Sequence, residues 1–102
     1  MFNSIDEIKV ANNDIGHHWF EPTSMRFFRS RVSNKVYGGH YFISSERYDD
    51  NSPRLFSIRK AADDGSISTV GEFQKYKTRR AAEIAINDIL DMKAYHPNRT
   101  SN

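Results

Sequence analysis

The chain has 102 residues, a length that fits one domain, and its 15 Lys and Arg residues against 13 Asp and Glu residues give a formal net charge of +2. It contains no cysteine, which excludes a disulfide framework and suits a reducing compartment such as the cytoplasm. Apolar runs are short and the first residues, MFNSIDEI, are acidic, so we expect neither a membrane partner nor a secretory signal peptide.

A first helix is expected at residues 4–15, in the sequence SIDEIKVANNDI. Ser4 is a good N-cap, and Glu7 stands three residues later, as in a capping box. Ile5 and Ile8 have the spacing of the buried stripe of a helix.

Residues 16–24, GHHWFEPTS, connect this helix to the sheet and contain the only tryptophan. Trp19 and Phe20 are large apolar side chains, so we expect them to close one end of the sheet. The alternative is that they form an exposed aromatic anchor for a partner.

Runs rich in aromatic and β-branched residues predict strands at residues 25–32, 40–47, 54–61 and 66–74. Alternation in the third strand directs Phe56 and Ile58 inward. It directs Ser57 and Arg59 outward. Gly38-Gly39 indicates a bulge or a close approach to the backbone, and Asp63-Asp64-Gly65 is typical of a hairpin turn.

A second helix is expected from Thr78, a good N-cap, to about Ala94. Its apolar stripe consists of Ala82, Ala85, Ile86, Ile89 and Met92. Because proline does not continue a helix, we expect this helix to end before Pro97. The chain would then consist of a single domain at residues 1–95 and a flexible tail at residues 96–102.

The expected fold is therefore α+β, in the order α-β-β-β-(β)-α. Short turns between consecutive strands predict an antiparallel meander of three to four strands. The N-terminal and C-terminal helices are expected to pack on one face of this sheet. The other face would then be wet and would carry the arginines.

Motifs of catalysis are absent from the sequence. It has no nucleophile elbow, P-loop or dinucleotide fingerprint. None of the four histidines has zinc-type spacing, and the adjacent His17 and His18 diverge. We therefore expect no enzymatic activity, catalytic residue, cofactor or metal.

Basic residues are concentrated in the predicted sheet. Residues 25–60 carry eight Lys and Arg residues against three acids, and residues 75–80 carry four with no acid. Lys and Arg bind phosphates, and exposed aromatic rings stack on unpaired bases. An ordinary solvated face, with arginines paired to neighbouring acids, is the alternative. The candidate residues for binding protein or nucleic acid are Arg26, Arg29, Arg31, Tyr37, Arg59, Lys75, Lys77, Arg79 and Arg80.

The order of elements, with a basic turn before the last helix, resembles a double-stranded-RNA-binding domain. The stretch is KYKTRRAAEIAINDIL at residues 75–90. In that family, basic residues at this helix start cross the major-groove phosphates, and the matching positions are Lys77, Arg79 and Arg80. The sequence departs from the family in its fourth strand and in three acids within the helix, Glu83, Asp88 and Asp91.

A second resemblance covers residues 16–82, through GHHWFEPTSMRFF, SRV, VYGGHYFISSE and TVGEFQKYKTRRAA. These strings resemble a group of small uncharacterised proteins of bacteriophages and mobile elements. The resemblance implies a phage-type accessory protein acting in the cytoplasm of a bacterial host. It carries no activity over to this chain.

Three functions follow as hypotheses. The first is non-enzymatic binding to a host or defence protein, with inhibition of that protein. The second is nucleic-acid binding through the basic sheet face and the Lys75–Arg80 turn, and the third is a small hydrolase or transferase. A shared exposed face of arginines and lysines favours nucleic acid, whereas interleaved acids or an apolar face favour a protein partner.

Overall fold

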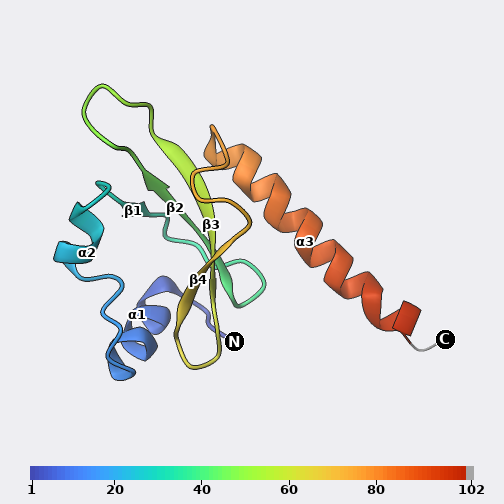
Figure 1. The fold of residues 1–102 in the computed structure, drawn as a ribbon. Helices are drawn as coiled ribbons and strands as arrows, with labels where there is room; N and C mark the ends of the chain where they lie inside the picture. The colour runs from blue at the N-terminus through green and yellow to red at the C-terminus, as the bar shows by residue number, and fades with distance from the viewer. Residues whose placement is uncertain (101–102) are drawn as a thin grey trace.

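The protein is built on one four-stranded antiparallel sheet in the order β1-β2-β3-β4 (Figure 1). The computed structural model describes the backbone of residues 1–100 and the side chains of residues 1–93. Its elements are α1 (Ile5–Asp14), α2 (Pro22–Arg26), β1 (Arg31–Val32), β2 (Tyr41–Glu46), β3 (Leu55–Ala61), β4 (Ile67–Val70) and α3 (Arg79–Thr100). The expected α+β fold, an antiparallel meander with a helix at each end, is confirmed.

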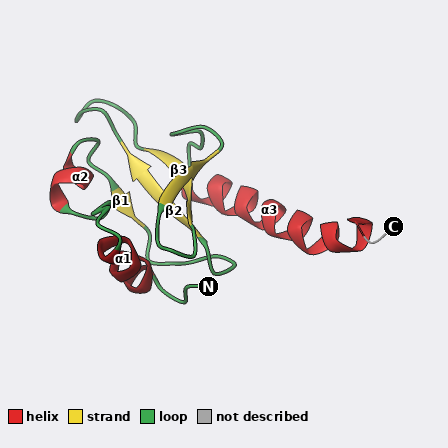
Figure 2. Ribbon diagram, turned by 60° about the horizontal axis from the view of Figure 1, so that its bottom comes forward, coloured by secondary structure: helices red, strands yellow, loops and turns green. Residues whose placement is uncertain are grey.

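The two terminal helices lie on opposite faces of the sheet rather than on one face (Figures 1 and 2). Ile86 of α3 packs with Tyr41 and Ile43, while α1 packs on Phe42 with side chains that include Ile8. Neighbouring strand residues point to opposite faces, and all six residues of β2 are buried. A strand that is apolar on both parities must be covered on both sides, so no wet sheet face remains.

The expected strand at residues 25–32 is shorter than the sequence indicates. Pro22 begins the helix α2, where its fixed φ fits the first turn. A tight turn follows, in which the N–H of Ser30 donates to the carbonyl of Met25 at 2.7 Å, and Arg29 has a φ of 49°. Only Arg31–Val32 forms ladder pairs with β2, because residues 22–26 are helical and the turn at Arg29 takes up the residues that follow.

A buried asparagine ties α1 to the rest of the fold. Asn12 donates to the carbonyl of Gly65 at 2.9 Å and accepts from the backbone N–H of Trp19 at 2.7 Å. The expected hairpin turn at residues 63–65 is confirmed, and Gly65 has a φ of 96°. A Cβ there would lie 2.6 Å from the backbone of Ala11, so glycine is needed for both conformation and contact.

The last strand and the last helix also differ from expectation. β4 ends at Val70 instead of near residue 74, because Gly71 and Gln74 both have positive φ. Thr78 caps α3 as expected, accepting from the N–H of Ala81 at 3.0 Å. The expectation that the helix ends before Pro97 is not met, because its backbone continues as a helix to Thr100. Of the expected tail, residues 101–102 lie outside the described part of the chain.

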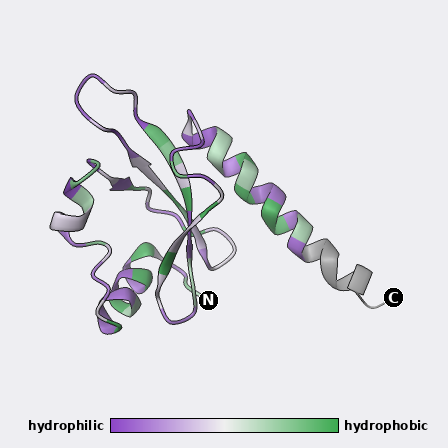
Figure 3. Cartoon of the chain, viewed as in Figure 1, coloured by the Kyte–Doolittle hydropathy of each residue, from purple (hydrophilic) through white to green (hydrophobic). Residues whose placement is uncertain are grey.

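Apolar segments meet where the sheet contacts α1 and the first turns of α3, whereas the tip of the β2–β3 loop is hydrophilic (Figure 3). Trp19 and Phe20 pack on Phe42, with ring centroids 5.8 and 5.9 Å from its ring. They therefore cover the α1 face rather than an end of the sheet. Among the helices of residues 1–100, none is long and apolar enough to cross a membrane.

Candidate functional site

Seven of the nine candidate residues are exposed, and two are not. The exposed ones are Arg26, Arg29, Arg31, Lys75, Lys77, Arg79 and Arg80. Tyr37 is 8% exposed and Arg59 is 9% exposed, so the expectation that both lie on an open sheet face is wrong. The physical reason is that both faces of the sheet are covered.

Five arginines line one surface depression of about 510 Å³, which we call the arginine hollow. It lies between α2, the turn before β1 and the β2–β3 loop, and its charged residues are Arg26, Arg29, Arg31, Arg47, Arg54 and Asp50. Arg47 and Arg54 were not among the candidates. The sequence could have indicated that Arg47 and Arg54 lie close together, because Arg47 follows β2 and Arg54 precedes β3. An antiparallel hairpin brings two such positions together.

Neutral carbonyl groups hold three of these guanidinium groups in place. Arg29 donates to the carbonyl of Tyr48 at 2.8 Å, and Arg47 donates to that of Asp49 at 2.9 Å. Arg54 donates to the carbonyls of Arg29 and Ser45 at 2.9 and 3.0 Å. A carbonyl orients a guanidinium without cancelling its charge, so the hollow remains strongly positive.

One carboxylate approaches the hollow. Asp50 lies 3.6 Å from Arg29, but its side chain is 87% exposed, and exposed pairs contribute little. Hydrogen bonds from the Ser52 hydroxyl and the N–H of Asn51 lower the pKa of Asp49 and occupy its carboxylate within the loop. Five guanidinium groups and one carboxylate, that of Asp50, therefore line the hollow, and the charge of Arg29 also lowers the pKa of Asp49.

Crowding of like charges is evident at Arg54. Burial lowers the pKa of its guanidinium, and the positive charges of Arg31 and Arg47 lower it further, while Glu46 opposes the shift. A bound anion would relieve this repulsion. The hollow is therefore electrostatically suited to an anionic ligand.

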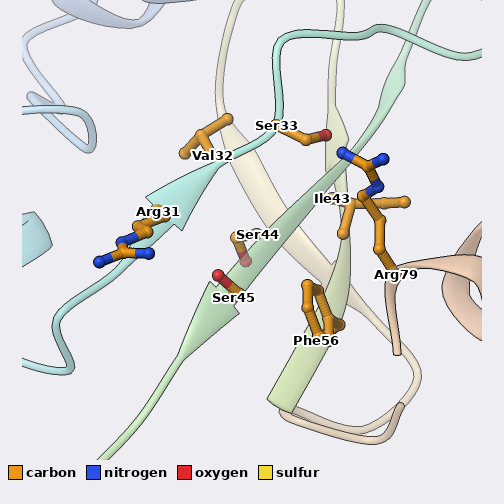
Figure 4. Close-up of a pocket in the computed structure, with 8 residues that line it drawn as sticks. All are labelled: Arg31, Val32, Ser33, Ile43, Ser44, Ser45, Phe56 and Arg79. Atoms are coloured by element: carbon orange, nitrogen blue, oxygen red, sulfur yellow. The ribbon is translucent and has the colours of Figure 1, made fainter. Parts of the chain in front are cut away.

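A smaller pocket of about 160 Å³ adjoins the hollow and shares Arg31 with it (Figure 4). Arg79, from the first turn of α3, lies on the side opposite Arg31. The buried hydroxyl of Ser33 has no hydrogen-bond partner among the described residues. Lys75, Lys77 and Arg80 are exposed but line neither depression.

Arg59, expected in water, forms a buried ion pair with Glu46. Its Nη2 lies 3.2 Å from Oε2 of Glu46, which is completely buried, and its Nε donates to the Ser44 hydroxyl at 2.9 Å. Its Nη1 donates to the Thr69 hydroxyl. The guanidinium also lies over two rings, 5.3 Å from the centroid of Trp19 and 5.2 Å from that of Phe73. The sequence left open a solvated face whose arginines pair with neighbouring acids; Arg59 has such a pair, but the pair is buried.

Next to Arg59 lies a cavity of about 220 Å³, which we call the aromatic cavity. Its walls are Trp19, Phe28 and Phe73, and Arg59 also lines it. Met25 and Ser30 line both this cavity and the arginine hollow, so the two depressions adjoin.

Tyr37 has a structural contact instead of an exposed ring. Its hydroxyl donates to Glu83 of α3 at 2.5 Å. Burial, followed by this hydrogen bond, raises the pKa of Tyr37 from 10.0 to about 12. The following Gly38 lies so close to α3 that a Cβ would be 2.5 Å from Leu90, which explains the expected close approach at Gly38-Gly39.

Two of the histidines, His18 and His40, lie within contact distance of polar groups. His18 lies 3.5 Å from Glu21, and His40 lies 2.9 Å from the carbonyl of Ala61 and 3.8 Å from Asp63. Within the described residues, no three His, Asp or Glu side chains form a group that could hold a metal ion.

Fold and surface together define a small α+β domain with an arginine-rich surface depression. The chain belongs to the family of unknown function DUF7447, whose model matches residues 4–87. This range contains the arginine hollow, the aromatic cavity and the first turns of α3, and it agrees with the expected membership of an uncharacterised family. No curated protein and no solved structure matches the chain.

Proposed function

We propose that this protein is a non-enzymatic nucleic-acid-binding domain whose arginine hollow holds the phosphate backbone. The observation that carries the proposal is the way the arginines are held: carbonyl oxygens orient Arg29, Arg47 and Arg54 and leave their charges available. Guanidinium groups fixed in this way form two-pronged hydrogen bonds with phosphate oxygens. Binding releases counterions from the nucleic acid, which favours complex formation at low salt.

The distribution of charge favours this function over a protein partner. Arg26, Arg29 and Arg31 share one exposed depression, and Arg79 lines the next one. Asp50 is the one acid that lines the arginine hollow, whereas Glu83 lies close enough to Arg79 for that arginine to lower its pKa. Of the basic residues that the RNA-binding resemblance singled out, Arg79 lines the smaller pocket that shares Arg31 with the hollow, and we include it in the proposed interface.

Binding to labelled single-stranded and double-stranded DNA and RNA tests the proposal. At about 50 mM salt we expect measurable binding that weakens at about 200 mM. Arg47→Glu should reduce affinity about tenfold at the lower salt concentration, because it removes one cation and adds a repulsive charge. Lys9→Glu on α1 makes the same charge change at an exposed site outside the hollow and should have a small effect. Absence of binding to every probe at low salt would refute the proposal.

A second candidate function rests on two exposed aromatic rings. Phe27 is 77% and Tyr48 is 63% exposed, and both pack edge-on against Phe28 beside the arginine hollow. Exposed aromatic and arginine side chains are enriched in the energetic centres of protein interfaces. In this proposal the chain is a phage-type accessory protein in the bacterial cytoplasm that binds and inhibits a host or defence protein.

Affinity capture from a host lysate with wild type and Phe27→Ala tests this second candidate. A specific protein that wild type recovers and Phe27→Ala loses supports it. Equal recovery by both proteins, or no specific recovery, counts against it.

A further inference from the structure

We infer that the aromatic cavity binds one unpaired nucleobase, so that the nucleic acid bound by this domain is single-stranded. The inference rests on the proposed function and specifies its ligand. Four properties of the cavity carry it: its size, its rings, the unused donors of Arg59 and its continuity with the arginine hollow.

The size of the cavity matches a single planar ring system. Its volume of about 220 Å³ is several times the roughly 30 Å³ that a water molecule occupies in the liquid. It is smaller than the roughly 300 Å³ at which pockets for drug-sized molecules begin. A base that leaves its stack has these dimensions, whereas a base pair is too large.

Three aromatic rings form the walls. The rings of Phe28 and Phe73 lie 5.4 Å apart and are tilted by 51°, and Trp19 closes the side near α1. The Arg59 guanidinium already lies over Trp19 and Phe73, so a base in the cavity packs on this guanidinium and on the parts of the rings that it leaves uncovered, with little dependence on sequence.

The backbone beside these rings is held in an unusual conformation. Within the described residues, positive φ at non-glycine positions occurs at His18, Arg29 and Gln74. These residues adjoin Trp19, Phe28 and Phe73, the three rings of the cavity. Positive φ is unfavourable for residues with a side chain and is concentrated at functional sites, so the strain agrees with walls that are positioned for a ligand.

Arg59 offers hydrogen-bond donors to a neutral group. A guanidinium has five N–H groups, and Arg59 directs three of them to Ser44, Thr69 and Glu46. The remaining two have no protein acceptor among the described residues, although Arg59 is only 9% exposed. Because Glu46 already neutralises its charge, a carbonyl oxygen or ring nitrogen of a base is a better match than a second anion.

Continuity with the arginine hollow identifies the ligand class. Met25 and Ser30 line both depressions, so a ligand that occupies the cavity and the hollow together has only these two residues to pass. One depression is aromatic with a neutralised cation, and the other is strongly cationic. A neutral planar ring linked to a phosphate is the chemistry of a nucleotide within a strand.

Three labelled probes of equal length, about 12 nucleotides, test the inference by fluorescence anisotropy with the full chain. They are an oligothymidine strand, an abasic strand with the same phosphates, and a duplex. We expect the thymidine strand to bind about tenfold more tightly than the abasic strand. Equal affinity for the two strands, or tighter binding of the duplex, would overturn the inference and leave the phosphate-binding function intact. Absence of binding by all three would refute the proposed function and the inference with it.

Trp19, the only tryptophan, supplies a second readout within the cavity. The thymidine strand should quench its fluorescence and the abasic strand should not, at equal saturation. Phe73→Ala should remove most of the preference for bases, and Ser24→Trp, which fills the cavity from α2 and leaves the three rings in place, should do the same. A base preference and quenching that survive both substitutions would overturn the inference.

Discussion

Substitution of Glu46 tests the contribution of its buried ion pair with Arg59 to stability. Glu46→Met removes the carboxylate that neutralises Arg59 and leaves a guanidinium with a side chain that is 11% exposed. Breaking a buried pair by removal of one partner costs about 3–5 kcal/mol. Domains of this size have a free energy of unfolding of about 5–15 kcal/mol, so the variant should fold with a much reduced margin.

Urea unfolding followed by circular dichroism measures this cost. With an m-value of about 2 kcal/mol/M, a loss of about 4 kcal/mol lowers the midpoint by roughly 2 M. Arg31→Met removes an exposed arginine of the adjacent strand and should change the free energy of unfolding by less than about 0.5 kcal/mol.

The double variant Glu46→Met/Arg59→Met distinguishes pairing from simple loss of packing. It removes both charges, so its main cost is the loss of hydrogen-bond partners by the hydroxyls of Ser44, Ser57 and Thr69, about 1 kcal/mol each. We expect it to be more stable than either single variant, with a coupling energy above about 2 kcal/mol. Additive costs of the two single substitutions would refute the account of the ion pair.

Two further predictions concern the turns at residue 65 and at residue 37. Gly65→Ala should destabilise the fold by about 2–3 kcal/mol in thermal unfolding, because the residue has a φ of 96° and its Cβ would meet the α1 backbone. Gly71→Ala is the control: its φ is 74° but a Cβ there meets open space, so it should cost only about 1 kcal/mol. Equal costs would show that the contact with α1 does not matter. The raised pKa of Tyr37, about 12 against 10.0, means that its stabilising contribution is complete below about pH 10 and is lost as the pH rises toward 12. Tyr37→Phe should therefore lower the free energy of unfolding at about pH 8 and flatten its decline above about pH 10, and identical pH profiles for the two proteins would contradict this.

Local signals in the sequence predict the elements that short-range chemistry determines. Ser4 and Thr78 cap their helices as expected, and the glycine turn at residues 63–65 forms its hairpin. Each of these depends on residues within four positions along the chain. The helix α2 was missed because a proline at its first turn was outweighed by the aromatic run after it.

Features that depend on tertiary structure could not be predicted from local patterns in the sequence. Alternation places Arg59 on the face opposite Ile58, but it does not tell whether that face is wet. The answer depends on Trp19, which reaches it from 40 positions earlier in the chain. Likewise, Arg26, Arg29 and Arg31 were candidates, but their convergence with Arg47 and Arg54 requires the β2–β3 hairpin to fold back beside α2.

The salt dependence of binding to a single-stranded oligonucleotide tests the central claim most directly. Each phosphate neutralised on a single strand contributes about −0.7 to the slope of log affinity against log salt. With five arginines in the hollow, the slope for wild type should lie near −2 to −4, and Arg47→Glu should make it shallower, while Lys9→Glu leaves it unchanged. A slope near zero, or equal slopes for Arg47→Glu and Lys9→Glu, would contradict the assignment of the arginine hollow as a phosphate-binding site.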